Sequence, residues 1–148
     1  MAPGETTTVT HASEPVEDVD RGLEPDEPAI SGPFSPRQLF RIDEALTAAD
    51  RETGLTFSIY VGELDQPTRT HAESLLEQLP EPPESVLLAV SPNQRTLEVV
   101  TGERASKRLP DRVCALAALS MTAAFGGGDL AGGVVTGVRM LADQARIA

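Results

Sequence analysis

The sequence is poor in cysteine and in aromatic residues. It contains one cysteine, Cys114, no tryptophan, and only 3% aromatic residues. A single cysteine permits neither an intramolecular disulfide nor a thiolate metal cluster, and it is typical of a protein from a reducing compartment. We therefore expect a cytoplasmic protein in which Cys114 is a small core residue.

Basic residues are also scarce. The chain has 12 lysines and arginines against 23 aspartates and glutamates, which gives a formal net charge of -11. Such a chain lacks the basic surface that neutralises nucleic-acid phosphates, and its few aromatic residues offer little stacking for single strands. We expect no nucleic-acid partner.

Long apolar runs are missing as well. Residues 1–10 lack both the basic start and the apolar stretch of a signal peptide. The longest apolar region, residues 113–125, is shorter than the roughly 20 residues that a membrane crossing needs, and it contains Ser120 and Thr122. The sequence therefore predicts no transmembrane segment, and it predicts a sheltered, buried helix in this region.

Much of the acidic charge lies in the first 33 residues. This segment has eight acidic residues against Arg21 alone, five prolines and almost no large apolar side chain. Ordering it would cost backbone entropy that no burial offsets. We expect residues 1–33 to be a disordered acidic tail, either a solubilising extension or a dock for a basic partner, and residues 34–148 to form one folded domain.

The folded part alternates between helical and strand patterns. Ser35, Pro36 and Gln38 have the spacing of a helix start closed by a capping box. Elsewhere, apolar residues recur either at helical spacing or with a period of two. The predicted elements, in order, are a helix over 36–52, a strand over 55–61, a helix opened by Pro67, strands over 86–90 and 96–100, a helix over 110–124 and a last helix capped by Asp129.

This order predicts the α/β class, with a three-layer α/β/α sandwich around a small mixed sheet. Strands 55–61 and 86–90 flank a helix, so they should be parallel neighbours in a right-handed crossover. The run 86–90 is continuously apolar and should be central in the sheet. The short turn from Ser91 to Gln94 predicts an antiparallel hairpin with 96–100.

The carboxyl ends of the parallel strands are the first place to look for a ligand site. Glu63 and Asp65 follow the first strand, and Asn93 and Arg95 lie in the turn of the hairpin. We expect these four residues to face one another across a candidate cleft. Carboxylate oxygens suit calcium and magnesium, so Glu63 and Asp65 form a candidate metal site, the other interpretation being a solvated loop.

The sequence offers no nucleophilic motif. His11 lies in the tail and His71 stands alone at the start of a helix, with no serine or cysteine motif to pair with it. The glycine run 126–128 joins two predicted helices and follows no strand, so it is neither a phosphate-binding loop nor a dinucleotide fingerprint. We therefore assign no catalytic residue.

The order of elements and several short motifs resemble the TPM domain family over about residues 34–147. The likeness begins with Phe34, Ser35 and Pro36 before the first helix and with Thr53 and Gly54 before a strand. The remaining matches are the run from Val86 to Val90, Arg95, Val99, Val100, Thr101, Gly102, Asp111, Phe125, Gly128, Asp129, Gly133 and Gly137.

This resemblance implies an α/β/α sandwich with a Rossmann-like look, in a soluble bacterial branch of a family whose biochemical role is unsettled. Some TPM proteins are described as calcium binders or phosphatases. Others are tethered to membranes and take part in the assembly or repair of membrane protein complexes.

Two functions follow from these observations. The first is an uncharacterised soluble binding or accessory domain that acts through protein–protein contacts, without enzymatic activity. The alternative is a phosphatase-like hydrolase dependent on calcium or magnesium, in which Glu63 and Asp65 hold the cation and Arg95 steadies the phosphate. The motifs leave open whether the protein is an enzyme.

Overall fold

The structure, a computed structural model, describes residues 8–10 and 34–146. The predicted disordered tail therefore lies outside the described residues except for Thr8–Thr10, and His11 lies outside them too. Thr8–Thr10 form strand β1, which sequence analysis did not predict. None of the described helices has the length and hydrophobicity needed to span a membrane.

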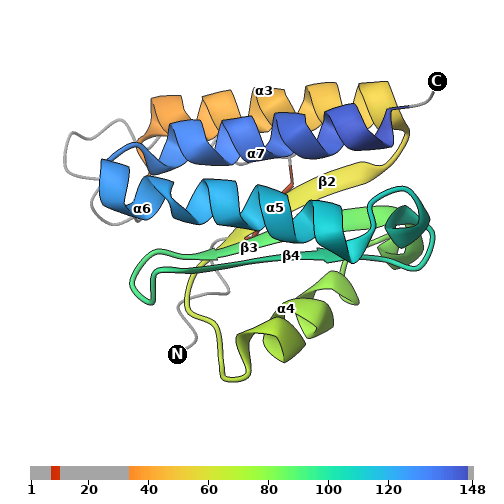
Figure 1. Cartoon of the computed structure of the whole chain (residues 1–148), viewed down its shortest axis with the longest axis horizontal. Helices are drawn as coiled ribbons and strands as arrows, with labels where there is room; N and C mark the ends of the chain where they lie inside the picture. Colours follow the sequence, from red (N-terminus) through yellow and green to blue (C-terminus); the bar gives the residue numbers. More distant parts are fainter. Residues whose placement is uncertain (1–7, 11–33, 147–148) are drawn as a thin grey trace.

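A four-stranded mixed sheet forms the middle layer, with its strands in the order β1-β2-β3-β4 (Figure 1). Strand β2 (Thr56–Val61) pairs in parallel with β3 (Ser85–Ser91). Strand β4 (Thr96–Thr101) pairs antiparallel with β3, and β1 pairs antiparallel with β2. The predicted parallel pair and hairpin are thus confirmed, and β4 is left as an edge strand of the described sheet.

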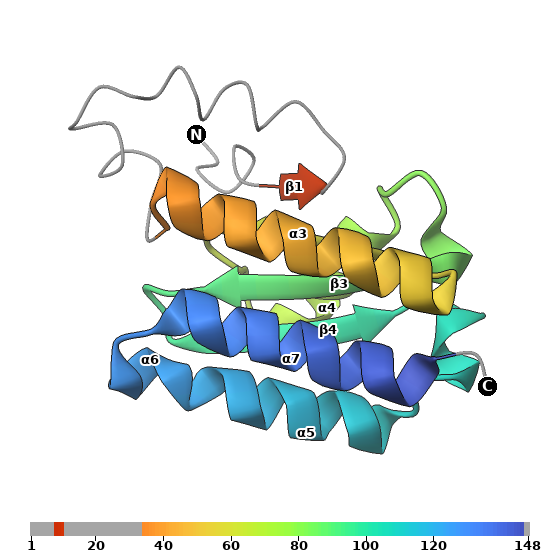
Figure 2. The same cartoon turned by 90° about the horizontal axis from the view of Figure 1, so that it is seen from above.

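Helices cover both faces of the sheet, which confirms the predicted three-layer sandwich. Helix α4 (Thr68–Leu76) lies on one face, where it packs on β3 and β4. On the other face, α3 (Pro36–Thr53) packs on β2 and α5 (Asp111–Thr122) packs on β4. Figure 2 shows α7 (Leu130–Ala145) between these two helices. The short elements are η2 (Pro82–Glu84), η3 (Ala105–Lys107) and α6 (Ala124–Gly127).

Strand β3 is the centre of the hydrophobic core. All of its residues are buried, as the continuous apolar run predicts for a strand covered on both faces. Leu88 faces the large cluster built with α3, α5 and α7, whereas Leu87 faces a smaller cluster with Ala72 and Leu76 of α4. Side chains of successive residues therefore anchor opposite helical layers.

Local capping signals fix the ends of the long helices. The Ser35 side chain accepts a hydrogen bond from the Gln38 amide, and the Gln38 side chain accepts one from the Ser35 amide, which is the predicted capping box. Gly54 ends α3 in the left-handed conformation, at φ 80°. Asp129 caps α7 by accepting from the Gly132 amide at 3.0 Å, as predicted.

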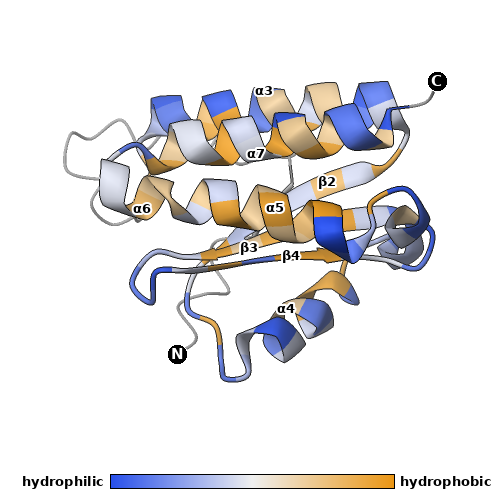
Figure 3. Cartoon of the chain, viewed as in Figure 1, coloured by the Kyte–Doolittle hydropathy of each residue, from blue (hydrophilic) through white to orange (hydrophobic). Residues whose placement is uncertain are grey.

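The prediction that the helix over 110–124 is sheltered is wrong for one of its faces. Leu116 and Leu119 of α5 are 57% and 68% exposed, whereas Cys114, Ala117 and Met121 are buried. The reason is the position of the helix: α7 occupies the middle of the helical layer, so α5 lies over the edge strand β4 and is covered on one side only. Figure 3 shows that α5 is hydrophobic over much of its length.

Gly102, just after β4, has no room for a side chain. A Cβ built there would lie 1.8 Å from the carbonyl oxygen of Pro82, so the backbone would have to move. We expect Gly102→Ala to lower the free energy of unfolding by about 2–4 kcal/mol in urea denaturation. The matched control is Gly127→Ala, whose Cβ would meet no described atom within 4 Å and should change stability by less than about 1 kcal/mol. Equal effects of the two substitutions would contradict this packing.

Candidate functional site

The two loops of the predicted cleft do meet, and a glutamine side chain joins them. The Leu64 amide donates to Gln94 Oε1 at 2.8 Å, and Gln94 Nε2 donates back to the Leu64 carbonyl at 2.9 Å. Ser91 Oγ donates to the same Oε1 at 2.5 Å. Sequence analysis did not identify Gln94, because one polar residue in a hairpin turn carries no signal for a contact 30 positions away.

The four residues of the candidate cleft divide into separate contacts. Asn93 Nδ2 donates to Glu63 Oε2 at 3.3 Å, so these two do face each other across the loops. Asp65 is exposed, and its amide donates to Nδ1 of His71 at 2.8 Å. Within the described residues, no group of three histidine, cysteine, aspartate or glutamate side chains is placed to hold a metal ion. Hydrogen bonds of Gln94 and Asn93 within the chain join the two loops.

Arg95 makes its contact elsewhere. Its backbone has a φ of 52°, in the left-handed region, and its guanidinium lies over the ring of Phe125, 5.8 Å from the centroid. The described residues show no ion pair between Arg95 and either Glu63 or Asp65. The structure thus brings Glu63 and Asn93 together and gives Arg95 a cation–π contact with α6.

The Gln94 contacts predict a difference in stability between two neighbouring residues. Gln94→Ala would leave the amide of the buried Leu64 without its acceptor, so we expect it to lower the free energy of unfolding by about 2 kcal/mol. Asn93→Ala removes one long, exposed hydrogen bond and should cost less than about 0.5 kcal/mol. Urea denaturation of both variants checks this expectation, which fails if Asn93→Ala is the more damaging.

A separate hollow of about 520 Å³ lies against the middle of the edge strand β4, beneath α5. Helix α4 contributes Arg69, and β4 contributes Glu98 and Val99. Helix α5 lines its other side from end to end. The lining residues from α5 are Asp111, Cys114, Ala115, Ala118, Leu119 and Thr122.

The backbone of β4 turns alternate residues towards this hollow. The Gly102 amide donates to the Ser85 carbonyl at 2.9 Å, which continues the ladder with β3. In an antiparallel pair of strands, directly opposed residues alternate between pairs that exchange backbone hydrogen bonds and pairs that do not. Gly102 and Ser85 form a bonded pair, so Val100 and Glu98 also bond to β3, whereas the backbone N–H and C=O of Val99 point away from β3. Arg69 Nη1 accordingly reaches the Val99 carbonyl from α4, at 3.4 Å.

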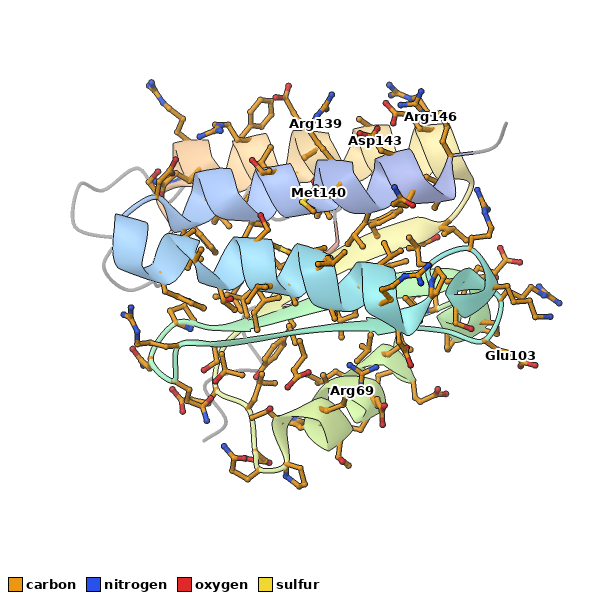
Figure 4. All side chains as sticks on the ribbon, in the orientation of Figure 1. Arg69, Glu103, Arg139, Met140, Asp143 and Arg146 are labelled. Carbon is orange, nitrogen blue, oxygen red and sulfur yellow. The ribbon has the colours of Figure 1, made fainter. Side chains whose placement is uncertain are left out.

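Arg69 lies across the open edge of the sheet (Figure 4). Its guanidinium also pairs with Glu98 at 3.8 Å and with Glu73 at 3.4 Å, and the side chain is half-exposed. Glu98 in turn accepts a hydrogen bond from Thr68 Oγ1 at 2.7 Å. Charged side chains at this position are a common means of protecting an unpaired strand edge.

Two exposed leucines adjoin the hollow. Leu119 lines it and is 68% exposed, and Leu116 lies one helical turn away on the same face of α5. We call the outward edge of β4, the hollow and these two leucines the β4–α5 surface. The apolar character of this helix predicts complete burial, and the exposure of Leu116 and Leu119 contradicts that prediction.

Cys114 lies at the floor of the hollow as a protonated thiol. It is 5% exposed, and its Sγ lies 3.6 Å from the Leu109 carbonyl. Burial, aided by the negative charge of Asp111, raises the pKa of the Cys114 thiol from 9.0 to about 11, although Arg69 acts in the opposite direction. The prediction of a small core residue is confirmed, and such a thiol is a poor nucleophile at neutral pH.

The raised pKa of Cys114 predicts a pH-dependent loss of stability. In the unfolded chain the thiol ionises above about pH 9, whereas the folded thiol keeps its proton to about pH 11. Ionisation of the thiol therefore stabilises the unfolded state as the pH rises between these values. The free energy of unfolding falls by about 2 kcal/mol relative to that of Cys114→Ala. Urea denaturation of both proteins at pH 8 to 11 measures the difference, and parallel pH curves would contradict it.

Comparison with known proteins identifies relatives over almost the whole chain. Residues 7–142 match the family described as "Domain of unknown function (DUF5130)". Two proteins of Mycobacterium tuberculosis are each 33% identical over 148 residues, covering 95% of this chain and 89% of the relative: "Uncharacterized protein Rv2468c" of strain H37Rv and "Uncharacterized protein MT2543" of strain CDC 1551.

Two solved structures share the fold. The solution NMR structure of the N-terminal domain of cg2496 from Corynebacterium glutamicum has a TM-score of 0.63 at 14% identity, covering 78% of this chain and 76% of that chain. The N-terminal domain of a protein from P. gingivalis gives a TM-score of 0.66 at 21% identity, covering 76% of each chain. At these identities the likeness establishes the fold and nothing further.

Proposed function

The chain belongs to the DUF5130 family, and we propose that it is a binding or accessory domain that engages a protein partner through the β4–α5 surface. The observation that carries the proposal is the exposure of Leu116 and Leu119, at 57% and 68%, beside an open strand edge. A single exposed leucine is ordinary on a protein surface. Two exposed leucines on one helical face, next to an apolar hollow and an edge strand of the described sheet, are typical of an interaction site.

The alternative of a metal-dependent hydrolase receives less support from the geometry. The mechanism that the sequence suggested needs Arg95 beside Glu63 and Asp65, whereas Arg95 lies over Phe125. The described residues also supply no third histidine, cysteine or carboxylate ligand for a cation held by Glu63 and Asp65. A protein-binding role requires neither arrangement.

We further infer that the likeness to the TPM domain family reflects a shared fold. The α/β/α sandwich supports this inference, as do the matching positions Ser35, Gly54 and Asp129, each of which caps a helix. We also infer a cytoplasmic protein, on the basis of a lone buried thiol, with no nucleic-acid partner for so acidic a chain.

The proposed function can be tested by cross-linking from the surface itself. A photo-reactive amino acid replaces Leu119 in one variant and Arg139, exposed on α7, in the control variant. In cells of the source organism we expect Leu119, and not Arg139, to cross-link to a distinct protein that mass spectrometry identifies.

The purified partner then allows a quantitative comparison. We expect Leu119→Glu to weaken its binding about tenfold or more, because the substitution places a charge on the apolar contact. Phe40→Glu is the matched control, since Phe40 is 51% exposed on α3, away from this surface. Identical cross-links from both positions, or unchanged binding by Leu119→Glu, would refute the proposed function.

A further inference from the structure

We propose that the β4 edge receives an extended peptide segment of a basic protein partner as an additional strand of the sheet, in competition with Arg69. This inference rests on the proposed function and specifies how the partner is recognised. Recognition by strand addition draws its affinity from backbone hydrogen bonds and its specificity from alternate side chains. The β4–α5 surface offers both.

The outward backbone N–H and C=O groups of β4 can form hydrogen bonds with an added strand. By the ladder alternation that places Val99 outward, Leu97 and Thr101 also direct their backbone groups away from β3. Val99 is only 2% exposed, and its amide points away from β3, so the ladder of the described sheet supplies it with no acceptor. A buried amide without an acceptor is costly, and a neighbouring strand satisfies a row of such groups at the required spacing.

The length of the hollow fits a short strand. Helix α5 lines it from Asp111 to Thr122, which at the rise of a helix is about 17 Å. A strand of about five residues has the same length, and β4 itself spans six residues. An added strand of this length would run beneath α5 and centre on Glu98 and Val99, the two β4 residues that line the hollow.

The two sides of the hollow differ in polarity, as an added strand requires. Side chains that point towards α5 would meet Ala115, Ala118 and Leu119, whereas those that point towards α4 would meet Arg69 and Glu98. Successive side chains of a strand point to opposite faces. The segment that fits this surface therefore alternates apolar residues with polar ones.

Charge argues for a different protein over a second copy of this chain. Residues 34–148 carry 15 acidic and 11 basic side chains, so two copies edge to edge would bring domains of the same net charge, -4 each, together. Glu98 and Asp111 both line the hollow, and Arg69 is the one cation among its described lining residues, so displacement of Arg69 leaves the edge acidic. A basic segment gains from this field, and the polar positions of the partner strand should be lysines or arginines.

Arg69 competes for the edge. The incoming strand needs the Val99 carbonyl, which accepts a hydrogen bond from Arg69 in the free protein. Glu73 and Glu98 hold the guanidinium in place, so its displacement costs free energy. A strand without matching side-chain contacts does not offset that free energy. Removal of this side chain should therefore strengthen the binding of a strand that fits.

The test uses a synthetic peptide in which valine alternates with lysine and threonine, followed by NMR amide exchange. We expect the peptide to slow exchange of the Leu97, Val99 and Thr101 amides about tenfold or more. The control peptide has every backbone nitrogen methylated and should give no protection, because neither of its edges can donate. Arg69→Ala should bind the first peptide about threefold or more tightly than the wild type, and Arg139→Ala should bind it unchanged.

The outcomes separate the mode of recognition from the proposed function. If neither the peptide nor the cross-linked partner protects these amides while the partner still binds through Leu119, strand addition is wrong and the binding function stands. If concentrating the protein alone protects them, a second copy occupies the edge and the proposed partner is wrong. Equal binding of the methylated peptide, or weaker binding by Arg69→Ala, also overturns the proposal.

Discussion

The arrangement of the whole chain depends on the burial of β3 between two hydrophobic clusters. Leu87 and Leu88 are adjacent in sequence and yet are buried on opposite faces, one with α4 and the other with α3, α5 and α7. This double burial requires partners on both edges of β3 and helices on both of its faces. The parallel pairing with β2 and the hairpin with β4 meet that requirement, and they set every other element in place.

The same constraint leaves one part of the molecule incompletely covered. Three helices share one face of a narrow sheet, and α7 occupies the middle through its packing on α3 and α5. Helix α5 is thereby displaced over β4, the outermost strand, with Leu119 exposed and a hollow beneath it. Arg69 reaches this edge from the opposite layer. The surface to which we assign partner binding is thus a consequence of how the core is packed.

Sequence reasoning succeeded where the signals are local. Helix α3 and strands β2, β3 and β4 follow from spacing, and Ser35 and Asp129 cap the helices that they were predicted to cap. It failed where contacts join distant positions. Strand β1 is too short to show a period, and an apolar helix does not reveal which of its faces a neighbour covers. The cation–π contact of Arg95 with Phe125 and the bonds of Gln94 to Leu64 depend on pairings that spacing does not encode.

The central claim of this account is an open β4 edge beneath α5, and amide hydrogen exchange of the free protein tests it most directly. The comparison is made within one strand, so that differences in global stability cancel. The account predicts that Glu98 and Val100, which bond to β3, exchange slowly, and that Val99 between them exchanges faster. Uniform protection along β4 would mean that the edge is already paired, and it would contradict the claim.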